Sequence, residues 1–157
     1  MTEITAAALA THPFLHGMSR DQLDVLAETA REVRFPARHR LFEDGGHATR
    51  CWLIRSGQVA LDLHVPGEGP MVVETIGMGE LLGWSWLFPP YQWAFGAVAL
   101  TPVDAFEFDG AAVRAACAAD HALGYELTGR LIRILAGRLQ ATRIRLLGRS
   151  GQAASVY

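Results

Sequence analysis

Lysine is absent from this chain of 157 residues, and all 14 of its basic residues are arginine. Its 16 acidic residues leave a net charge of −2, so the whole molecule does not attract a polyanionic partner. Cysteine is scarce: Cys51 and Cys117 lie far apart and form no CxxC pair. Two thiols are too few for a disulfide framework or an iron–sulfur site, and this scarcity fits the reduced cytoplasm.

Long apolar runs are also missing. No run approaches the roughly 20 residues of a membrane helix, and residues 1–15 carry no basic leader. We therefore expect a cytoplasmic protein with neither an export signal nor a membrane span. No Ser/His/Asp spacing or carboxylate pair indicates an enzyme. His12 and His16 have the spacing of a metal pair, but Pro13 interrupts the helix that this spacing needs, so no metal site is predicted.

What the chain does have is an aromatic segment at 79–99. Its rings alternate at period two on both sides of Pro89-Pro90, which predicts two short extended arms with one face of rings. Upstream, Glu80 lies between Gly79 and Gly83, where backbone amides can turn outward and bind an anionic ligand. A hairpin whose aromatic pairs only fill a small core would show the same pattern. The segment alone leaves both interpretations open.

The N-terminal part, up to residue 35, has a helical pattern. After a short turn at 4–10, Ser19 begins a capping box with Gln22, and Pro36 ends the segment. From 38 to 108 the pattern changes to short alternating runs separated by glycine and proline turns, which is typical of an antiparallel roll. We predict strands at 40–42, 51–55, 58–65, 71–76, 93–100 and 104–108.

Two helices are predicted after the roll. Asp109 can cap the first, to about residue 118, and the second runs over about 123–147. The second carries an apolar stripe that must be covered, either by the roll or by a second copy of the chain. We expect a homodimer through the stripe residues Leu131, Leu135, Leu139, Thr142 and Leu146. The opposite face is rich in arginine, and such a face is more often solvated than functional.

This order of elements resembles the cyclic nucleotide-binding domain of the catabolite-activator (Crp/Fnr-like) type. Segment 42–59 looks like the strand–turn–strand signature of that family, GELLG at 79–83 is similar to the opening of its phosphate-binding cassette, and RLQAT at 138–142 resembles its ligand-closing helix. The resemblance implies a mainly β fold: an antiparallel β-roll or jelly roll (double-stranded β-helix) flanked by N-terminal helices and a long C-terminal helix.

The domain plan follows from this resemblance. We expect one cyclic nucleotide-binding-like domain over 1–157, with N-terminal helices at 1–35, a β-roll at 36–108 that contains the cassette at 79–99, helices at 109–147 and a frayed tail at 148–157. In related transcription factors the DNA-binding domain follows the long helix, and in this sequence only the ten-residue tail follows it. We therefore expect no sequence-specific DNA binding.

The resemblance also implies a site for cyclic AMP or cyclic GMP. The Glu80 carboxylate would accept a hydrogen bond from the sugar 2′-hydroxyl, the amides around Leu82–Ser85 would face the cyclic phosphate, and Thr142 would touch the base. Thr142 could instead return its hydroxyl to the helix backbone. The candidate ligand-binding residues are Gly79, Glu80, Leu81, Leu82, Gly83, Trp84, Ser85, Gln92, Trp93, Ala94 and Thr142.

One departure from the family pattern is large. The family clamps the phosphate with an arginine and a small hydroxyl residue, where this chain has Trp93 and Ala94. No arginine lies between Arg55 and Arg114, so the nearest polar substitute is Gln92. A charge-assisted hydrogen bond contributes about 1.5–3 kcal/mol, and its loss implies roughly ten- to hundred-fold weaker binding. Trp93 can stack on a planar ligand or fill the empty phosphate pocket.

Three functions remain open. The first is a stand-alone sensory module that binds a small ligand weakly, or binds an altered one, and signals to a protein partner that the sequence does not identify. The second is a degenerate domain that serves as a scaffold for protein interaction and dimerisation without a ligand. The third is non-specific nucleic-acid binding through the arginine face of the terminal helix.

Overall fold

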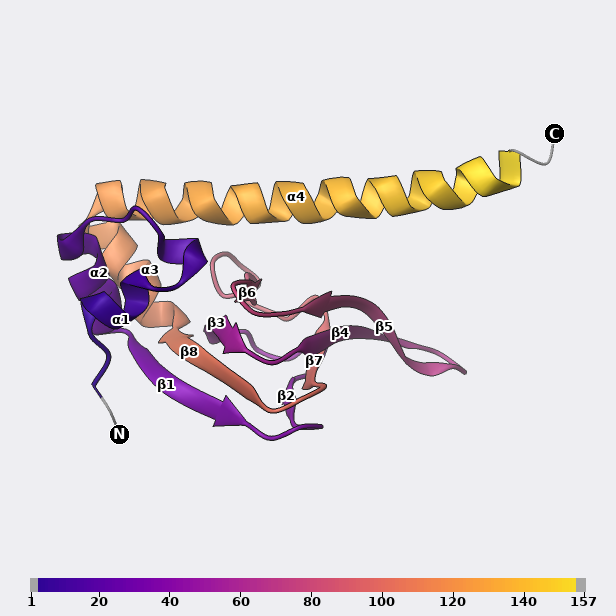
Figure 1. The fold of residues 1–157 in the computed structure, drawn as a ribbon, viewed down its shortest axis with the longest axis horizontal. Helices are drawn as coiled ribbons and strands as arrows, with labels where there is room; N and C mark the ends of the chain where they lie inside the picture. The colour runs from indigo at the N-terminus through magenta and orange to yellow at the C-terminus, as the bar shows by residue number, and fades with distance from the viewer. Residues whose placement is uncertain (1–2, 155–157) are drawn as a thin grey trace.

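The structure is a computed structural model and describes residues 3–154. Two four-stranded antiparallel sheets form a roll, and helices cover one end and one side of it (Figure 1). The helical elements are α1 (Ala6–Ala10), a 3-10 turn (Pro13–Leu15), α2 (Arg20–Ala27), α3 (Gly110–Ala119) and α4 (His121–Ala154). The strands are β1 (Ala30–Phe35), β2 (Arg40–Phe42), β3 (Arg50–Ser56), β4 (Val59–Val65), β5 (Gly69–Ile76), β6 (Leu81–Leu82), β7 (Gly96–Ala99) and β8 (Val103–Asp109).

The two sheets confirm the predicted β-roll. One has the order β1-β8-β3-β6 and the other β2-β7-β4-β5. All six predicted strands occur, although the strand predicted at 93–100 is shorter and covers only Gly96–Ala99. Strand β6 pairs with β3, with Leu82 opposite Trp52 and Leu81 opposite Leu53. This pairing fixes the start of segment 79–99 at the edge of the first sheet, beside β3.

The predicted N-terminal helices are correct only up to Ala27. The Ser19 capping box is present, since the Ser19 side chain accepts a hydrogen bond from Gln22 and the Gln22 side chain accepts one from Ser19. The expectation of helix up to Pro36 is wrong, because residues 30–35 form strand β1, which pairs with β8. The run AREVRF alternates at period two and half-buries Val33 and Phe35, so it belongs to the sheet.

The C-terminal helices extend further than predicted. The Asp109 side chain caps α3 by accepting from the Ala112 N–H at 3.1 Å, as expected. Helix α4 begins after Asp120 and continues to Ala154, about 50 Å at 1.5 Å per residue. The expected frayed tail at 148–157 is therefore wrong for 148–154, which are helical, and residues 155–157 lie outside the described part. Within residues 3–154, each helix is too short or too polar to cross a membrane.

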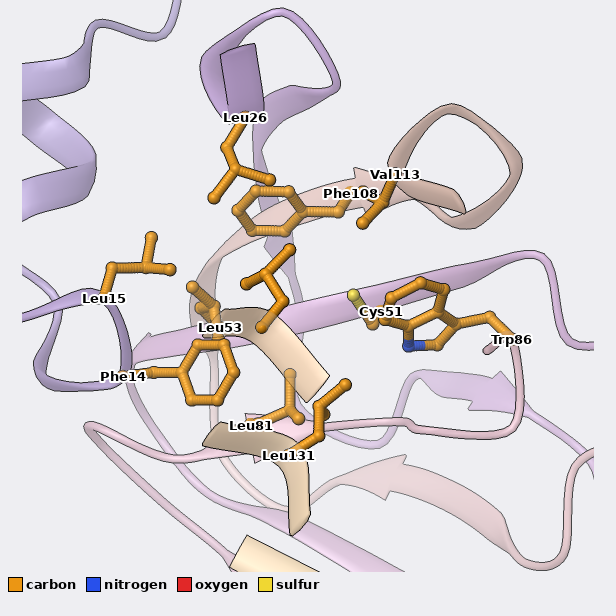
Figure 2. A pocket seen from close by; sticks show the side chains of 11 residues that line it. Phe14, Leu15, Leu26, Cys51, Leu53, Leu81, Trp86, Phe108, Val113 and Leu131 are labelled. Carbon is orange, nitrogen blue, oxygen red and sulfur yellow. The ribbon is translucent and has the colours of Figure 1, made fainter. Parts of the chain in front are cut away.

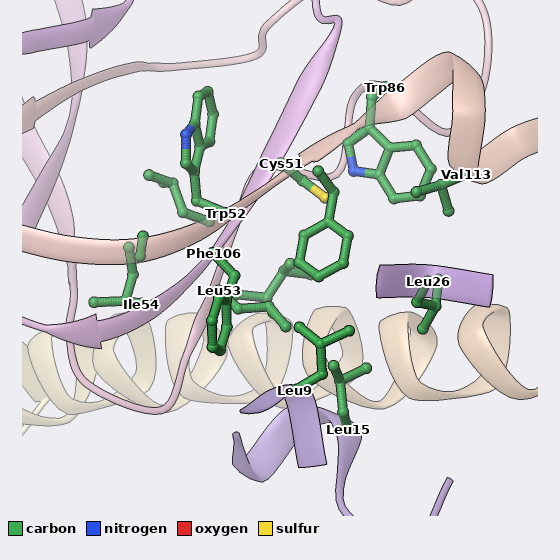
Figure 3. Packing of buried hydrophobic residues seen from close by; sticks show 14 of the residues in the cluster. Leu9, Leu15, Leu26, Cys51, Trp52, Leu53, Ile54, Trp86, Phe106 and Val113 are labelled. Atoms are coloured by element: carbon green, nitrogen blue, oxygen red, sulfur yellow. The ribbon is translucent and has the colours of Figure 1, made fainter. Parts of the chain in front are cut away.

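The core lies between one sheet and the helices. Figure 3 shows Leu53 and Phe106 from the sheet meeting Leu9 and Leu15 from the N-terminal elements. The first half of α4 completes this core with Leu123, Leu127 and Leu131, which are all buried. Leu131 is therefore not available for the predicted contact with a second copy, which is a correction to that prediction. Residues 139–148, which we call the free half of α4, are all exposed.

A buried ion pair links the strands of the second sheet. The Arg40 guanidinium of β2 donates to both carboxylate oxygens of Asp62 on β4, each at 2.8 Å. Strand β7 runs between β2 and β4, and a Cβ at its Gly96 would lie 2.3 Å from an Asp62 oxygen. Glycine is required at 96 because the ion pair crosses β7 at that point. Bonding to Asp62 also raises the pKa of Arg40.

His12 is a structural histidine at the contact between the 3-10 turn and β3. Its Nε2 lies 2.9 Å from the Ile54 carbonyl oxygen, and its Nδ1 accepts from the Phe14 N–H at 3.2 Å. These two partners assign a neutral ring with the proton on Nε2. Burial lowers the pKa of His12 by removing water from its charged form; the bond to Ile54 opposes the shift and Arg55 adds to it.

This lowered pKa makes stability depend on pH. Below about pH 6.5 the unfolded chain binds a proton that folded His12 resists, so the free energy of unfolding should fall as the pH is lowered through this range. We expect His12→Gln to lose less stability between about pH 7.5 and about pH 5.5 than the wild type, in urea titrations. His16→Gln is the control, since His16 is exposed. A His12→Gln variant that keeps the full pH dependence contradicts this account.

Candidate ligand site

The start of segment 79–99 is a turn that only glycine can build at two positions. Gly79 and Gly83 have φ angles of +82° and +93°. The Gly79 N–H donates to the Ile54 carbonyl at 2.9 Å, and the Ile54 N–H donates to the Glu80 carbonyl at 3.0 Å. We call residues 79–83 the glycine turn. Its attachment to β3 on both sides of Glu80 holds it in one place.

In the described part of the chain, three backbone N–H groups that follow the glycine turn are not used by the hydrogen bonds of the fold, and two of them belong to the buried residues Gly83 and Ser85. Among the residues that the structure describes, the backbone N–H groups of Gly83, Trp84 and Ser85 have no protein acceptor. Glu80 is exposed, and its Oε2 accepts the Gly77 N–H at 2.5 Å. One carboxylate and three N–H groups thus lie within six residues. They can accept from a hydroxyl and donate to an anion, so the ligand roles predicted for Glu80 and for residues 82–85 stay predictions.

The Trp93 side chain packs against the glycine turn and covers Gly83. The indole is 6% exposed and stacks on the Phe42 ring, with centroids 3.8 Å apart. A Cβ at Gly83 would lie 3.0 Å from two atoms of this indole. Trp52 stacks on the same cluster at 6.0 Å. The side chain of Trp93, which the resemblance predicts at the position of the family's clamp, therefore packs between Phe42 and Gly83.

The other aromatic residues of segment 79–99 point to different places, so the prediction of two extended arms with one face of rings is wrong. Trp86 is buried and faces the helices, as Figure 2 and Figure 3 show. Trp84 is half-buried and stacks on Phe88 at 5.7 Å, and Phe88 is itself exposed. Residues 83–91 form turns, because backbone contacts with the β2–β3 connection override the period-two pattern.

Those backbone contacts tie segment 91–93 to residues 45–48. Trp93 donates to the Gly46 carbonyl and accepts from the Gly45 N–H, both at 2.8 Å, and the Tyr91 carbonyl accepts from the Ala48 N–H at 2.6 Å. The side chains of Gln92 and Ala94 are exposed. The structure thus brings Trp93, but neither Gln92 nor Ala94, into the buried cluster beside Gly83.

Two arginines from the C-terminal helices contact the cassette, and no local residue pattern indicates either contact. Arg114 of α3 donates to the Trp86 carbonyl and lies over the Tyr91 ring, 4.4 Å from its centroid. Arg138 of α4 donates to the Leu81 carbonyl in the glycine turn. The prediction that Gln92 is the nearest polar substitute for the missing arginine considered only residues close in sequence, and these two arginines are further cations that contact the cassette.

The arginine face of α4 is only partly solvated. Arg130 and Arg138 have side chains 14% and 17% exposed, and Arg130 donates to the Phe14 carbonyl at 2.7 Å. These two arginines hold α4 on its own domain. Thr142 is exposed and its hydroxyl donates to the Arg138 carbonyl at 2.9 Å, so it takes the backbone role that the sequence left as the alternative.

The enclosed cavity between the sheet and the helices is not the candidate site. Figure 2 shows its apolar lining, which includes Phe14, Cys51 and Leu131. Its volume is about 30 Å³, far below the roughly 300 Å³ of the smallest usual ligand pockets.

A β-roll with a glycine turn covered by a C-terminal helix defines the class as a cyclic nucleotide-binding module. A family model described as "Cyclic nucleotide-binding domain" matches residues 32–120, and the chain belongs to this family. It is 28% identical over 134 residues to a CRP-like cAMP-activated global transcriptional regulator of Mycobacterium tuberculosis. That match covers 85% of this chain and 58% of the relative, so the chain spans less than two thirds of the relative's length.

Experimental structures show the same fold. A cyclic nucleotide-binding domain from Methylobacillus flagellatus KT superposes with a TM-score of 0.76 at 21% identity, over 84% of this chain and 74% of that one. The Thermus thermophilus Catabolite Activator Protein gives a TM-score of 0.69 at 22% identity, over 85% of this chain and 61% of that one. At these identities the likeness establishes the fold, and the ligand has to be argued from this chain's own residues.

The Trp93 packing predicts a large effect on stability. We expect Trp93→Ala to lower the free energy of unfolding by about 3–5 kcal/mol, because it leaves a cavity between Phe42 and Gly83. The measurement is urea unfolding followed by circular dichroism. Trp84→Ala removes the same side chain from a half-buried position and should cost clearly less. Equal losses in the two variants would show that Trp93 is not the packed residue.

Proposed function

We propose that this protein is a small-molecule regulatory module of the cyclic nucleotide-binding family whose nucleotide binding is weak or altered. The observation that carries the proposal is Trp93: its indole packs on Gly83, where the family places its phosphate-clamping arginine. The free amides after the glycine turn and the exposed Glu80 carboxylate support retention of a ligand site. The missing clamp supports low affinity for cyclic AMP and cyclic GMP.

The output surface that we propose is the free half of α4. Leu139 and Leu146 are 52% and 57% exposed, and Leu135 and Thr142 lie on the same stripe. Two copies that pair through this stripe would cover apolar side chains that water otherwise contacts. We propose a cytoplasmic homodimer that acts on a protein partner, with no catalysis and no membrane contact. A ligand at the glycine turn would act by shifting how α4 sits on the roll.

A second candidate is a scaffold without a ligand. The burial of Trp93 favours it, because a side chain that fills the phosphate position leaves less room for a nucleotide. In this version the α4 stripe and its dimer would be the whole function. The two candidates differ in one measurable property, which is binding of a small molecule at Glu80.

Calorimetric titration with cyclic AMP and cyclic GMP tests the ligand. We expect weak binding that saturates only near millimolar ligand, because the clamp's charge-assisted bond is missing. Glu80→Gln should weaken it further, whereas Glu68→Gln, at an exposed turn between β4 and β5, should not. Absence of heat at millimolar ligand would favour the scaffold. Tight binding would contradict the role given to Trp93.

Light scattering after size-exclusion chromatography tests the dimer. We expect a dimer for the wild type and a monomer for the double variant Leu139→Asp, Leu146→Asp, because two charges would be buried in the interface. Ile144→Asp is the control: Ile144 is 59% exposed but lies about 140° around the helix from Leu139 at about 100° per residue. A wild-type monomer, or a double variant that stays dimeric, contradicts the proposal.

A further inference from the structure

A cluster of charges lies on the part of the first sheet that is remote from the glycine turn. The sheet has the order β1-β8-β3-β6, so β6, which belongs to the glycine turn, forms one edge and β1 forms the other. In the strand register, Glu107 of β8 lies opposite both Arg31 of β1 and Trp52 of β3. Strand β1 runs along the lower side of the roll, whereas α4 runs along its upper side (Figure 1).

Glu107 is a buried carboxylate that two half-exposed arginines share. Its side chain is 5% exposed, and its Oε1 accepts from Arg31 Nε at 2.7 Å and lies 3.2 Å from Arg50 Nη1. Its Oε2 accepts from the Trp52 indole N–H at 2.9 Å. Arg31 and Arg50 are 52% and 51% exposed. Two guanidinium groups therefore face one carboxylate, which leaves one positive charge in excess and several N–H groups directed to solvent.

The two arginines line a cleft that also contains carboxylates. The cleft has a volume of about 340 Å³, and its lining includes Glu28 and Asp109. Glu28 is exposed at the C-terminal end of α2, and Asp109 is exposed at the start of α3. The cleft thus presents donors from β1 and β3 and acceptors from two helix ends. Its volume lies at the lower end of the roughly 300–1,000 Å³ of small-molecule sites.

We propose that this cleft binds a small zwitterion of the class of the free α-amino acids. The carboxylate of the ligand accepts from the guanidinium groups of Arg31 and Arg50, because arginine binds carboxylates through charge-assisted hydrogen bonds. Its ammonium group donates to the carboxylates of Glu28 and Asp109. A ligand that is only an anion meets these two carboxylates as like charges, and a ligand that is only a cation meets the two arginines.

Glu107 connects this cleft to the aromatic cluster around Trp93. Trp52, which donates to Glu107, stacks on Phe42 at 5.6 Å and on Trp93 at 6.0 Å. A ligand carboxylate that competes for the two guanidinium groups changes the hydrogen bonds of Glu107, and with them the surroundings of the Trp52 indole. The fluorescence of Trp52 therefore reports binding in the cleft. This inference goes beyond the proposed function, since it needs no ligand at the glycine turn.

The probes for the test are the free L-amino acids found in proteins. Thermal unfolding of the full chain is measured with each amino acid at millimolar concentration, and we expect at least one to raise the midpoint. Calorimetry then compares that amino acid with its analogue without the amino group and its analogue without the carboxyl group. Each analogue should bind about 10- to 100-fold more weakly, as the loss of a charge-assisted hydrogen bond implies.

Variants assign the binding to the cleft. Arg50→Gln should lower the affinity for the amino acid about 10- to 100-fold, and Glu28→Gln should reduce the advantage of the amino acid over its analogue without the amino group. Arg34→Gln is the control, because Arg34 is 87% exposed on β1 and pairs with Asp104 outside the cleft. Trp52→Phe should keep the heat of binding and lose the change in tryptophan fluorescence. Thermal unfolding verifies that each variant is folded.

The proposal is overturned if no amino acid changes the unfolding of the wild type, or if a folded Arg50→Gln variant binds as tightly as the wild type. The cluster then serves only to neutralise Glu107. An analogue without the amino group that binds as tightly as the amino acid rejects the zwitterion. None of these results bears on the glycine turn, which the titration with cyclic AMP and cyclic GMP tests separately.

Discussion

The packing of one indole against one glycine governs how the whole cassette is built. Trp93 fits above Gly83 because residue 83 has no side chain, and it stays there because its backbone exchanges two hydrogen bonds with Gly45 and Gly46. The stack with Phe42 then joins the cassette to β2. In the proposed function, this packing takes the place of the family's phosphate clamp. Any ligand must therefore bind with the groups that remain around it.

Those remaining groups come from two parts of the chain. The glycine turn supplies a carboxylate and free amides, and α4 supplies the Arg138 guanidinium. The first half of α4 is part of the core and residues 139–148 are exposed, with Arg138 at the boundary. A change at the glycine turn can reach the free half through that residue, since it contacts both. The position of α4 and the glycine turn are in this way physically linked.

Much of the fold could be predicted from residue patterns. Alternation and turn residues predicted the strands, and Ser19 and Asp109 predicted two helix starts, because these signals act over a few neighbouring residues. The site was less predictable. The aromatic side chains of segment 79–99 lie in three different environments. Backbone hydrogen bonds to residues 45–48 override the period-two spacing of these residues in the sequence. The contacts of Arg114 and Arg138 join residues 28 and 57 positions apart, and no local pattern encodes them.

The central claim is that Trp93 fills the position of the phosphate clamp, so that a ligand of the proposed site contacts the glycine turn at Glu80. The most direct measurement is a crystal structure of protein purified from cells, with the electron density examined around the glycine turn. The account predicts the Trp93 indole packed on Gly83, with any ligand density of the proposed site at Glu80. Density for a phosphate in the place of the indole, with Trp93 displaced from Phe42, would contradict it.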